Sequence, residues 1–358
     1  MHLRLRALAV MDPRLWASVG LAALVACGGT AKPPAASTAS APHPSLPSPA
    51  FLDLIPADTA YAYMVIDPVD HGGVKSYLRR HEIAAALAGM KDYFSQHRSD
   101  MSTQPLVARL LLAAMSEADG DLASLGIDPS PRLAIWGMGL LPVARFELAD
   151  GAKFRAFAER VFQRAGVHPT EETFQGTRYW LIEDSVDVVV AVIGDEVALS
   201  VFPPASKTAI LPYVLGEKRP QRSLADVHAL AEIQTAAGFE HPNLLGFINF
   251  VRAAEAFTTK DRGIHNGVWP GAQLFHDPAC AREVPALFET MPRLIFGWEH
   301  HDADHISARI VLETRPDITE RLARMVAAVP GLSTKATEGT AAAMGIGVDV
   351  GEVLDFIA

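Results

Sequence analysis

The feature that most constrains the fold of this chain is an internal repeat. A segment that opens with "PRL" at Pro131 resembles a later segment that opens with "PRL" at Pro292. In both, two strand-like runs joined by a hairpin precede an amphipathic helix. Because one register survives across two strands and a helix, we predict that the segments are copies. The positions matched after the hairpin are Ala144 with Ala308, Arg145 with Arg309, Phe154 with Ile318, Ala158 with Leu322, Val161 with Met325, Phe162 with Val326 and Ala165 with Val329.

The repeat predicts an α+β fold. Two duplicated lobes, each ordered strand, hairpin, strand, helix, strand, are expected to form mainly antiparallel sheets with helices packed on them. In each copy, one strand followed by helical segments is expected before the "PRL" segment. Before the first we expect a strand at 60–66 and helices at 74–96 and 105–118, and before the second a strand at 243–250 and helices at 252–257 and 281–289. Between the copies we expect strands at 177–183, 187–193 and 197–202 and helices at 206–215 and 224–235.

The chain divides into four predicted regions. Residues 1–26 are expected to be a signal peptide, 27–50 a tether, 51–240 the first α+β lobe and 241–358 the second. The second copy stops soon after its final expected strand at 342–350. Either the fold closes there with a short helix at 352–357, or the sequence is cut short.

The N-terminus has the pattern of a targeting segment. Arg4, Arg6 and Arg14 precede an apolar run over 15–26, with a second candidate start at Met11. A membrane-spanning helix needs about 20 apolar residues, so this shorter run favours the hydrophobic region of a signal peptide.

Residues 24–27, "LVAC", resemble the lipobox of bacterial lipoproteins. The resemblance implies that the Cys27 thiol carries diacylglycerol, that a lipoprotein signal peptidase cuts before it, and that the freed amine is acylated. Gly28 follows rather than Asp, which in that family favours the outer membrane, on its periplasmic or its surface side. The tract at 28–50 has six prolines among Ala, Ser and Thr, which favours a solvated spacer. The alternative is an ordinary secretory signal with an incidental cysteine.

The folded region opens with "IPADTAYAYMVID", from Ile55 to Asp67. This opening resembles a family of uncharacterised bacterial envelope proteins that begin with Pro-Ala-Asp-Thr and a strand, a family that implies no reaction. Pro56 favours an extended entry, and Asp58 with Thr59 can cap a turn before the strand. We therefore expect a structural role for this motif.

Two places carry chemically competent side chains. The expected tip of the second hairpin, "EHHDADH", has three residues more than its counterpart and offers ligands suited to zinc or copper, although a solvated polar turn is the simpler interpretation. Those candidate ligands are His300, His301, Asp302, Asp304 and His305. Cys280 has no disulfide partner if Cys27 is acylated, and we expect an unreactive thiol there although His276 lies four residues away.

Charge and motifs limit the function. The formal charge of −10 opposes binding of nucleic acid, and motifs for metalloproteases, dinucleotides and phosphate loops are incomplete. We therefore expect an envelope lipoprotein without a cofactor, bound to the membrane through its lipid, that binds an envelope protein or a ligand or has a structural role. The alternative is a hydrolase-type enzyme whose site lies in the cleft between the two lobes.

Overall fold

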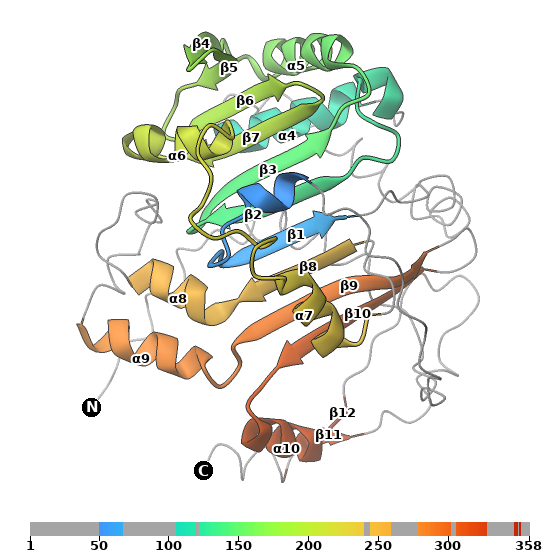
Figure 1. The fold of residues 1–358 in the computed structure, drawn as a ribbon, viewed down its shortest axis with the longest axis vertical. Coiled ribbons are helices and arrows are strands. Elements are labelled where there is room, and N and C mark those ends of the chain that lie inside the picture. Colours follow the sequence, from blue (N-terminus) through green and yellow to red (C-terminus); the bar gives the residue numbers. More distant parts are fainter. Residues whose placement is uncertain are drawn as a thin grey trace.

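A computed structural model describes residues 50–66, 105–118, 122–239, 244–258, 278–301, 306–327, 347–349 and 351. In these ranges the protein is α+β, as predicted, with one ten-stranded antiparallel sheet and seven α-helices (Figure 1). The strands of this sheet are β1 (Tyr61–Val65), β2 (Leu133–Met138), β3 (Leu141–Glu147), β4 (Thr170–Phe174), β5 (Thr177–Ile182), β6 (Asp187–Ile193), β7 (Glu196–Phe202), β8 (Leu244–Asn249), β9 (Arg293–His301) and β10 (Ile306–Glu313).

The helices lie between these strands and after the last of them. They are α4 (Leu106–Glu117), α5 (Gly151–Ala165), α6 (Lys207–Val214), α7 (Ala229–Ala237), α8 (Phe250–Thr258), α9 (Pro278–Phe288) and α10 (Pro316–Met325). Smaller elements are the 3-10 turns η2 (Ala50–Leu54), η4 (Leu122–Leu125) and η5 (Pro204–Ser206), and a two-stranded sheet of β11 (Val326–Ala327) and β12 (Gly347–Val348).

The sheet joins the two predicted lobes. Its strand order is β10-β9-β8-β1-β2-β3-β7-β6-β5-β4, so the opening strands of the two predicted copies, β1 and β8, lie side by side. They pair antiparallel, with Tyr63 opposite Gly246. Outward from this pair, β1-β2-β3 and β8-β9-β10 follow in the same sequence order on opposite sides.

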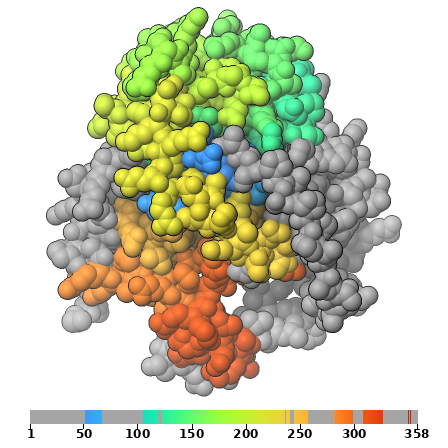
Figure 2. All heavy atoms as spheres, viewed as in Figure 1, coloured from blue at the N-terminus to red at the C-terminus, as the bar shows by residue number. Residues whose placement is uncertain are grey.

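Alternation along the strands gives the sheet two apolar faces. On β6, Val189 and Ala191 belong to one core and Val188 and Val190 to the other. Helices α6 and α7 and the turn η2 cover the first face, and Figure 2 shows the yellow chain from α6 to α7 lying across the blue residues 50–66. Helices α4 and α5 cover the second face over β5, β6 and β7.

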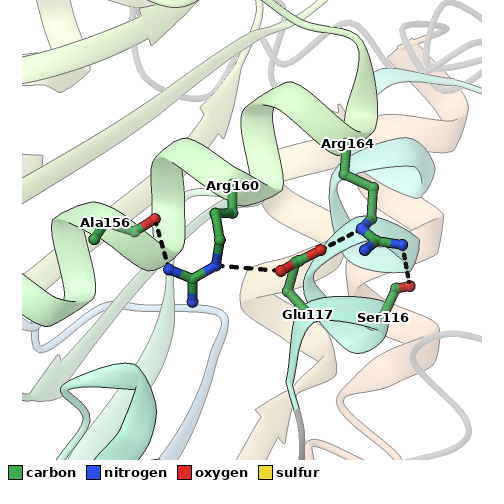
Figure 3. Close-up of polar contacts among 5 residues, drawn as sticks. All are labelled: Ser116, Glu117, Ala156, Arg160 and Arg164. Carbon is green, nitrogen blue, oxygen red and sulfur yellow. Dashed lines mark hydrogen bonds and ion pairs between the residues drawn. The ribbon is translucent and has the colours of Figure 1, made fainter.

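Helices α4 and α5 are also held together by charge. Glu117, at the end of α4, accepts hydrogen bonds from the Nε atoms of Arg160 and Arg164 on α5 (Figure 3). Arg164 also donates from Nη1 to the hydroxyl of Ser116 at 3.0 Å. One carboxylate therefore accepts from two guanidinium groups one helical turn apart.

Helix α5 has the boundaries that its sequence favours. Asp150 precedes it and accepts hydrogen bonds from the N–H groups of Ala152 and Lys153 at 2.9 and 3.0 Å, as an N-cap does. Gly166 ends it in the left-handed conformation, with φ of 66°. Its apolar stripe is buried, as predicted.

Most predicted elements in the described ranges are confirmed, with a few corrected boundaries. Helix α7 begins at Ala229 rather than at 224, because 224–228 form turns and His228 has φ of 49°. Helix α10 ends at Met325, so Val326, matched to a helical position, begins β11 instead. The helices expected at 74–96 and 352–357 and the matched Val329 lie outside the described residues, and of the strand expected at 342–350 only Gly347–Val348 is described.

The hairpin register corrects the predicted length difference. Leu133 lies opposite Phe146, 13 residues later, whereas Leu294 lies opposite Leu312, 18 residues later. The second hairpin is therefore five residues longer than the first, not three. Ile318 follows Leu312 by six positions, whereas its match Phe154 follows Phe146 by eight, which restores the three-residue difference at the helices.

Candidate functional site

A cavity of about 800 Å³ lies where the two predicted lobes meet, and we call it the junction cavity. It occupies the end of the sheet at which β1 and β9 begin and β2 and β8 finish. The chain from α6 to α7 also contributes to its wall. The residues that line it are Pro56, Ala57, Asp58, Thr59, Gly137, Met138, Gly139, Tyr213, Pro220, Gln221, Arg222, Leu224, Val227, Ala229, Glu232, Ile233, Phe247, Asn249, Arg252 and Arg293.

The Pro-Ala-Asp-Thr motif forms one wall of the junction cavity. Thr59 is 1 % exposed, and its hydroxyl lies 2.8 Å from the carbonyl oxygen of Gly137 and 3.2 Å from the N–H of the same residue. Pro56 closes a turn by accepting from the N–H of Thr59 at 3.1 Å, as expected. The motif therefore has the structural role predicted from the sequence, and it also places Asp58 on the cavity wall.

Gly137 has no side chain, which leaves room for the groups that pack closely against it. A Cβ atom at this position would lie 2.4 Å from the carbonyl oxygen of Gly139 and 2.9 Å from Cε1 of Tyr61. The Tyr61 hydroxyl donates to the carbonyl oxygen of Leu140 at 3.3 Å, and burial raises its pKa well above the usual range. Tyr61 is therefore a neutral hydrogen-bond donor beside this turn and not a titrating group.

Helix α8 ties the second lobe to the first at the junction cavity. The side chain of Asn249 accepts from the backbone N–H of Arg252 at 2.9 Å, as an N-cap does, and the backbone N–H of Asn249 donates to the carbonyl oxygen of Ala60 at 2.7 Å. Nη1 of Arg252 donates to the carbonyl oxygen of Ala57 at 2.7 Å. The bonds to Ala60 and Ala57 cross the boundary between the predicted lobes and fix the wall of the cavity.

Charged side chains of both signs line the cavity. Arg293 is neutralised by Glu313, to which it donates from Nε and Nη2 at 2.7 and 2.8 Å. Arg222 is exposed, as are Asp58 and Glu232. The lining thus combines guanidinium, carboxylate, amide and apolar groups, the mixture found in cavities that orient small ligands.

No family model, no curated protein and no solved structure matches this chain.

The candidate metal ligands of the second hairpin are not at the end of the sheet that holds the junction cavity wherever the structure describes them. His300 and His301 end β9, paired in register with Ser307 and Ile306, while Asp302, Asp304 and His305 lie outside the described residues. Within the described ranges, no group of three or more His, Cys, Asp or Glu residues could hold a metal ion.

The structure describes one of the two cysteines. Cys280 lies in α9, whereas Cys27 lies outside the described residues. A search of the described helices for one long and apolar enough to span a bilayer found none.

Sequence reasoning missed the arginines of the junction cavity. Arg222 and Arg252 belong to no motif, and Arg293 stood out only as part of the second "PRL" segment. The three come together only when the two predicted lobes pair through β1 and β8. The one local signal was Asn249 three residues before Arg252, a spacing that favours an N-cap and a helix start but not a site.

Proposed function

We propose that this protein is a lipoprotein of the bacterial envelope whose folded body binds a small molecule in the junction cavity. The observation that carries the binding role is the cavity itself. Its volume of about 800 Å³ lies in the range of ligand sites, and hydrogen bonds from Asn249 and Arg252 to the Pro-Ala-Asp-Thr segment preform its wall. A preformed site loses little conformational entropy on binding.

The proposed anchor is lipid on Cys27, inserted in the outer membrane and facing the periplasm or the cell surface. Its support is the "LVAC" sequence, the short apolar run before it and the proline-rich tract after it. Two or three acyl chains hold a protein stably on a bilayer, at about 0.8 kcal/mol per buried CH₂ group. An envelope protein that delivers or receives the ligand is the partner we propose.

Mass spectrometry of the full chain, produced in a Gram-negative host, tests the anchor. The expected N-terminal peptide begins at Cys27 and carries acyl chains. Cys27→Ser should keep the leader and lose the acyl mass, while the matched control Cys280→Ser should be processed like the wild type. A wild-type chain that keeps its leader, or that carries a free thiol at Cys27, would refute the anchor.

Ligand release tests the binding role. Small molecules freed by denaturing the purified chain are identified by mass spectrometry for the wild type, for Ala229→Trp and for Ala231→Trp. Ala229 lines the cavity, so tryptophan there should obstruct it and abolish release, whereas Ala231 is exposed on the same helix and serves as the control. A wild type that releases nothing, or an Ala229→Trp variant that releases the same molecule, would contradict a binding role for this cavity.

We further propose that the two halves of the sheet arose by duplication of one unit. The support is the order of β1-β2-β3 and β8-β9-β10, which run outward in opposite directions from the pairing of β1 with β8. In addition, the arginine of each "PRL" segment pairs with the glutamate at the end of the returning strand. These pairs are Arg132 with Glu147 and Arg293 with Glu313.

A further inference from the structure

Arg252, in α8, differs from three arginines of the neighbouring strands in how its charge is balanced. Arg132, Arg145 and Arg293 each pair with a glutamate. Among the described residues, the half-buried Arg252 instead donates only from Nη1, to the carbonyl oxygens of Ala57 and Thr59 at 2.7 and 3.4 Å. Carbonyl oxygens orient a guanidinium group but do not neutralise it, so Arg252 keeps a full positive charge.

The remaining donors of Arg252 are available to a ligand. Its Nε and Nη2 atoms form no hydrogen bond within the described part of the chain, and the side chain lines the junction cavity. A guanidinium group held by one nitrogen presents its other N–H groups in a fixed plane, a geometry that suits a carboxylate or phosphate group. Arg222 adds a second positive charge on the same wall, although Asp226 lies near enough for this charge to help lower the pKa of its carboxyl group.

We propose that the junction cavity binds a small molecule through an oxyanion, a carboxylate or a phosphate group, that Arg252 holds. This inference rests on the proposed binding function and adds the chemical class of the ligand. The acidic charge of the whole chain, −10, opposes the approach of polyanions. The cavity volume also fits a small molecule and not a polymer. Asp58 and Glu232 on the same wall can accept from amino or hydroxyl groups of the same ligand.

Thermal unfolding of the full chain with three named probes tests the proposal. The probes are glutarate, inorganic phosphate and, as a neutral isostere of glutarate, glutaramide, all at the same ionic strength. At least one of the two anions should raise the Tm of the wild type, and glutaramide should not. A shift with glutarate alone identifies a carboxylate ligand, and a shift with phosphate alone identifies a phosphate ligand.

Variants then assign the effect to Arg252. Arg252→Gln should abolish the shift and Arg252→Lys should retain part of it. The control Arg178→Gln should retain all of it, because that side chain is 72 % exposed and pairs with Glu171 on β4. Circular dichroism checks that each variant is folded. Equal shifts in Arg252→Gln and the wild type, or no shift with either anion, would overturn the proposal.

Ligand release distinguishes a wrong assignment of Arg252 from the absence of a ligand in the junction cavity. If Arg252→Gln still releases the molecule that Ala229→Trp loses, the cavity binds a ligand but Arg252 does not hold it. If the wild type releases nothing and neither anion shifts its Tm, both proposals are wrong.

Discussion

Helices α5 and α10 each follow a hairpin that opens with "PRL", one in each half of the sheet, but they differ in burial. Helix α5 buries six apolar side chains, including Phe154 and Val161, while α10 buries none, and its Ile318 and Leu322 are only half-buried. Both helices have an amphipathic pattern. The pattern therefore indicates which face of a helix can pack, but not how completely it does so.

The neighbours of the two helices explain the difference. Helix α5 lies on Trp180, Ile182 and Val190, which come from strands β5 and β6 beyond β3. In the described part of the chain no strand lies beyond β10, which is the edge of the sheet. The extra strands β4 to β7, rather than the repeated unit, thus supply the surface that buries a helix.

The largest expected effect comes from truncating a buried side chain of α5. Phe154 is 5 % exposed and packs edge-on against Phe146, with ring centroids 5.7 Å apart. Phe154→Ala should lower the free energy of unfolding by about 3–5 kcal/mol, because it leaves a cavity. The matched variant Leu322→Ala in α10 should cost less than about 1 kcal/mol. Urea unfolding of the full chain measures both, and equal losses would contradict the comparison.

Two glycines next to arginines give the next largest difference. Gly216 has φ of 78°, and a Cβ atom there would lie 2.8 Å from Nη2 of Arg145, which is 5 % exposed and donates to the carbonyl oxygen of Val214. Gly238 has φ of 70° and would place Cβ 3.0 Å from Nη1 of Arg309, which is exposed. A left-handed alanine alone costs about 1–2 kcal/mol.

Gly216→Ala should therefore cost about 2–3 kcal/mol and Gly238→Ala about 1 kcal/mol, because Arg145 cannot move and Arg309 can. Gly166→Ala is the control for backbone strain alone, since its φ is 66° and no atom lies within 4 Å of an added Cβ. The comparison fails if Gly216→Ala costs no more than the other two substitutions.

Close packing in the first half of the sheet also buries a carboxylate. Asp187 is 2 % exposed and its Oδ1 atom has no hydrogen-bond partner in the described structure. Desolvation raises the pKa of this carboxyl, the charge of Glu183 raises it further, and Lys207 opposes the shift. The folded-state pKa of Asp187 lies above its unfolded-state pKa. Its contribution to stability is therefore most favourable below the unfolded-state pKa, and it is lost as the pH rises through the folded-state pKa.

Asp187→Asn should remove this loss and raise the free energy of unfolding at pH 7 by about 1 kcal/mol. Glu172→Gln is a control of opposite sign. Hydrogen bonds from Tyr179 and Lys207 lower the pKa of Glu172, so its contribution is present at neutral pH and lost as the pH falls. Unfolding curves between pH 3 and pH 8 measure both variants. A stability that is unchanged or lower in Asp187→Asn at pH 7 would contradict the assignment.

The sequence predicted which residues form strands and helices better than it predicted which of these elements contact one another. The continuous apolar run "DVVVAVI" identifies β6, because a strand that is buried on both faces is apolar throughout. The helical spacing from Phe154 to Ala165 identifies α5, because burial of one helix face leaves a period in the sequence. The single sheet joined through β1 and β8 has no such local signal, since pairing between residues 61–65 and 244–248 depends on contacts far apart in the chain. Arg252 was missed for the same reason, because its partner, the carbonyl oxygen of Ala57, lies in the other lobe.

The smallest effect tests whether the two hairpins are equivalent. Arg132 donates from Nε to Glu147 at 2.7 Å, and Arg293 donates from Nε to Glu313 at the same distance. Both ion pairs are partly exposed, with side-chain exposures of 39 % and 26 % in the first and 27 % and 26 % in the second. Such pairs contribute about 0.2–1 kcal/mol.

Arg132→Gln and Arg293→Gln should therefore lower stability by similar amounts, about 0.5 kcal/mol each, and by less at high salt. Urea unfolding at low and high ionic strength measures both variants. Equal losses, set against the unequal losses expected at Phe154 and Leu322, would mean that the hairpins are energetically alike and that only the helices differ. A loss confined to Arg132→Gln would mean that the difference between the halves already begins within the repeated strands, before α5 and α10 are reached.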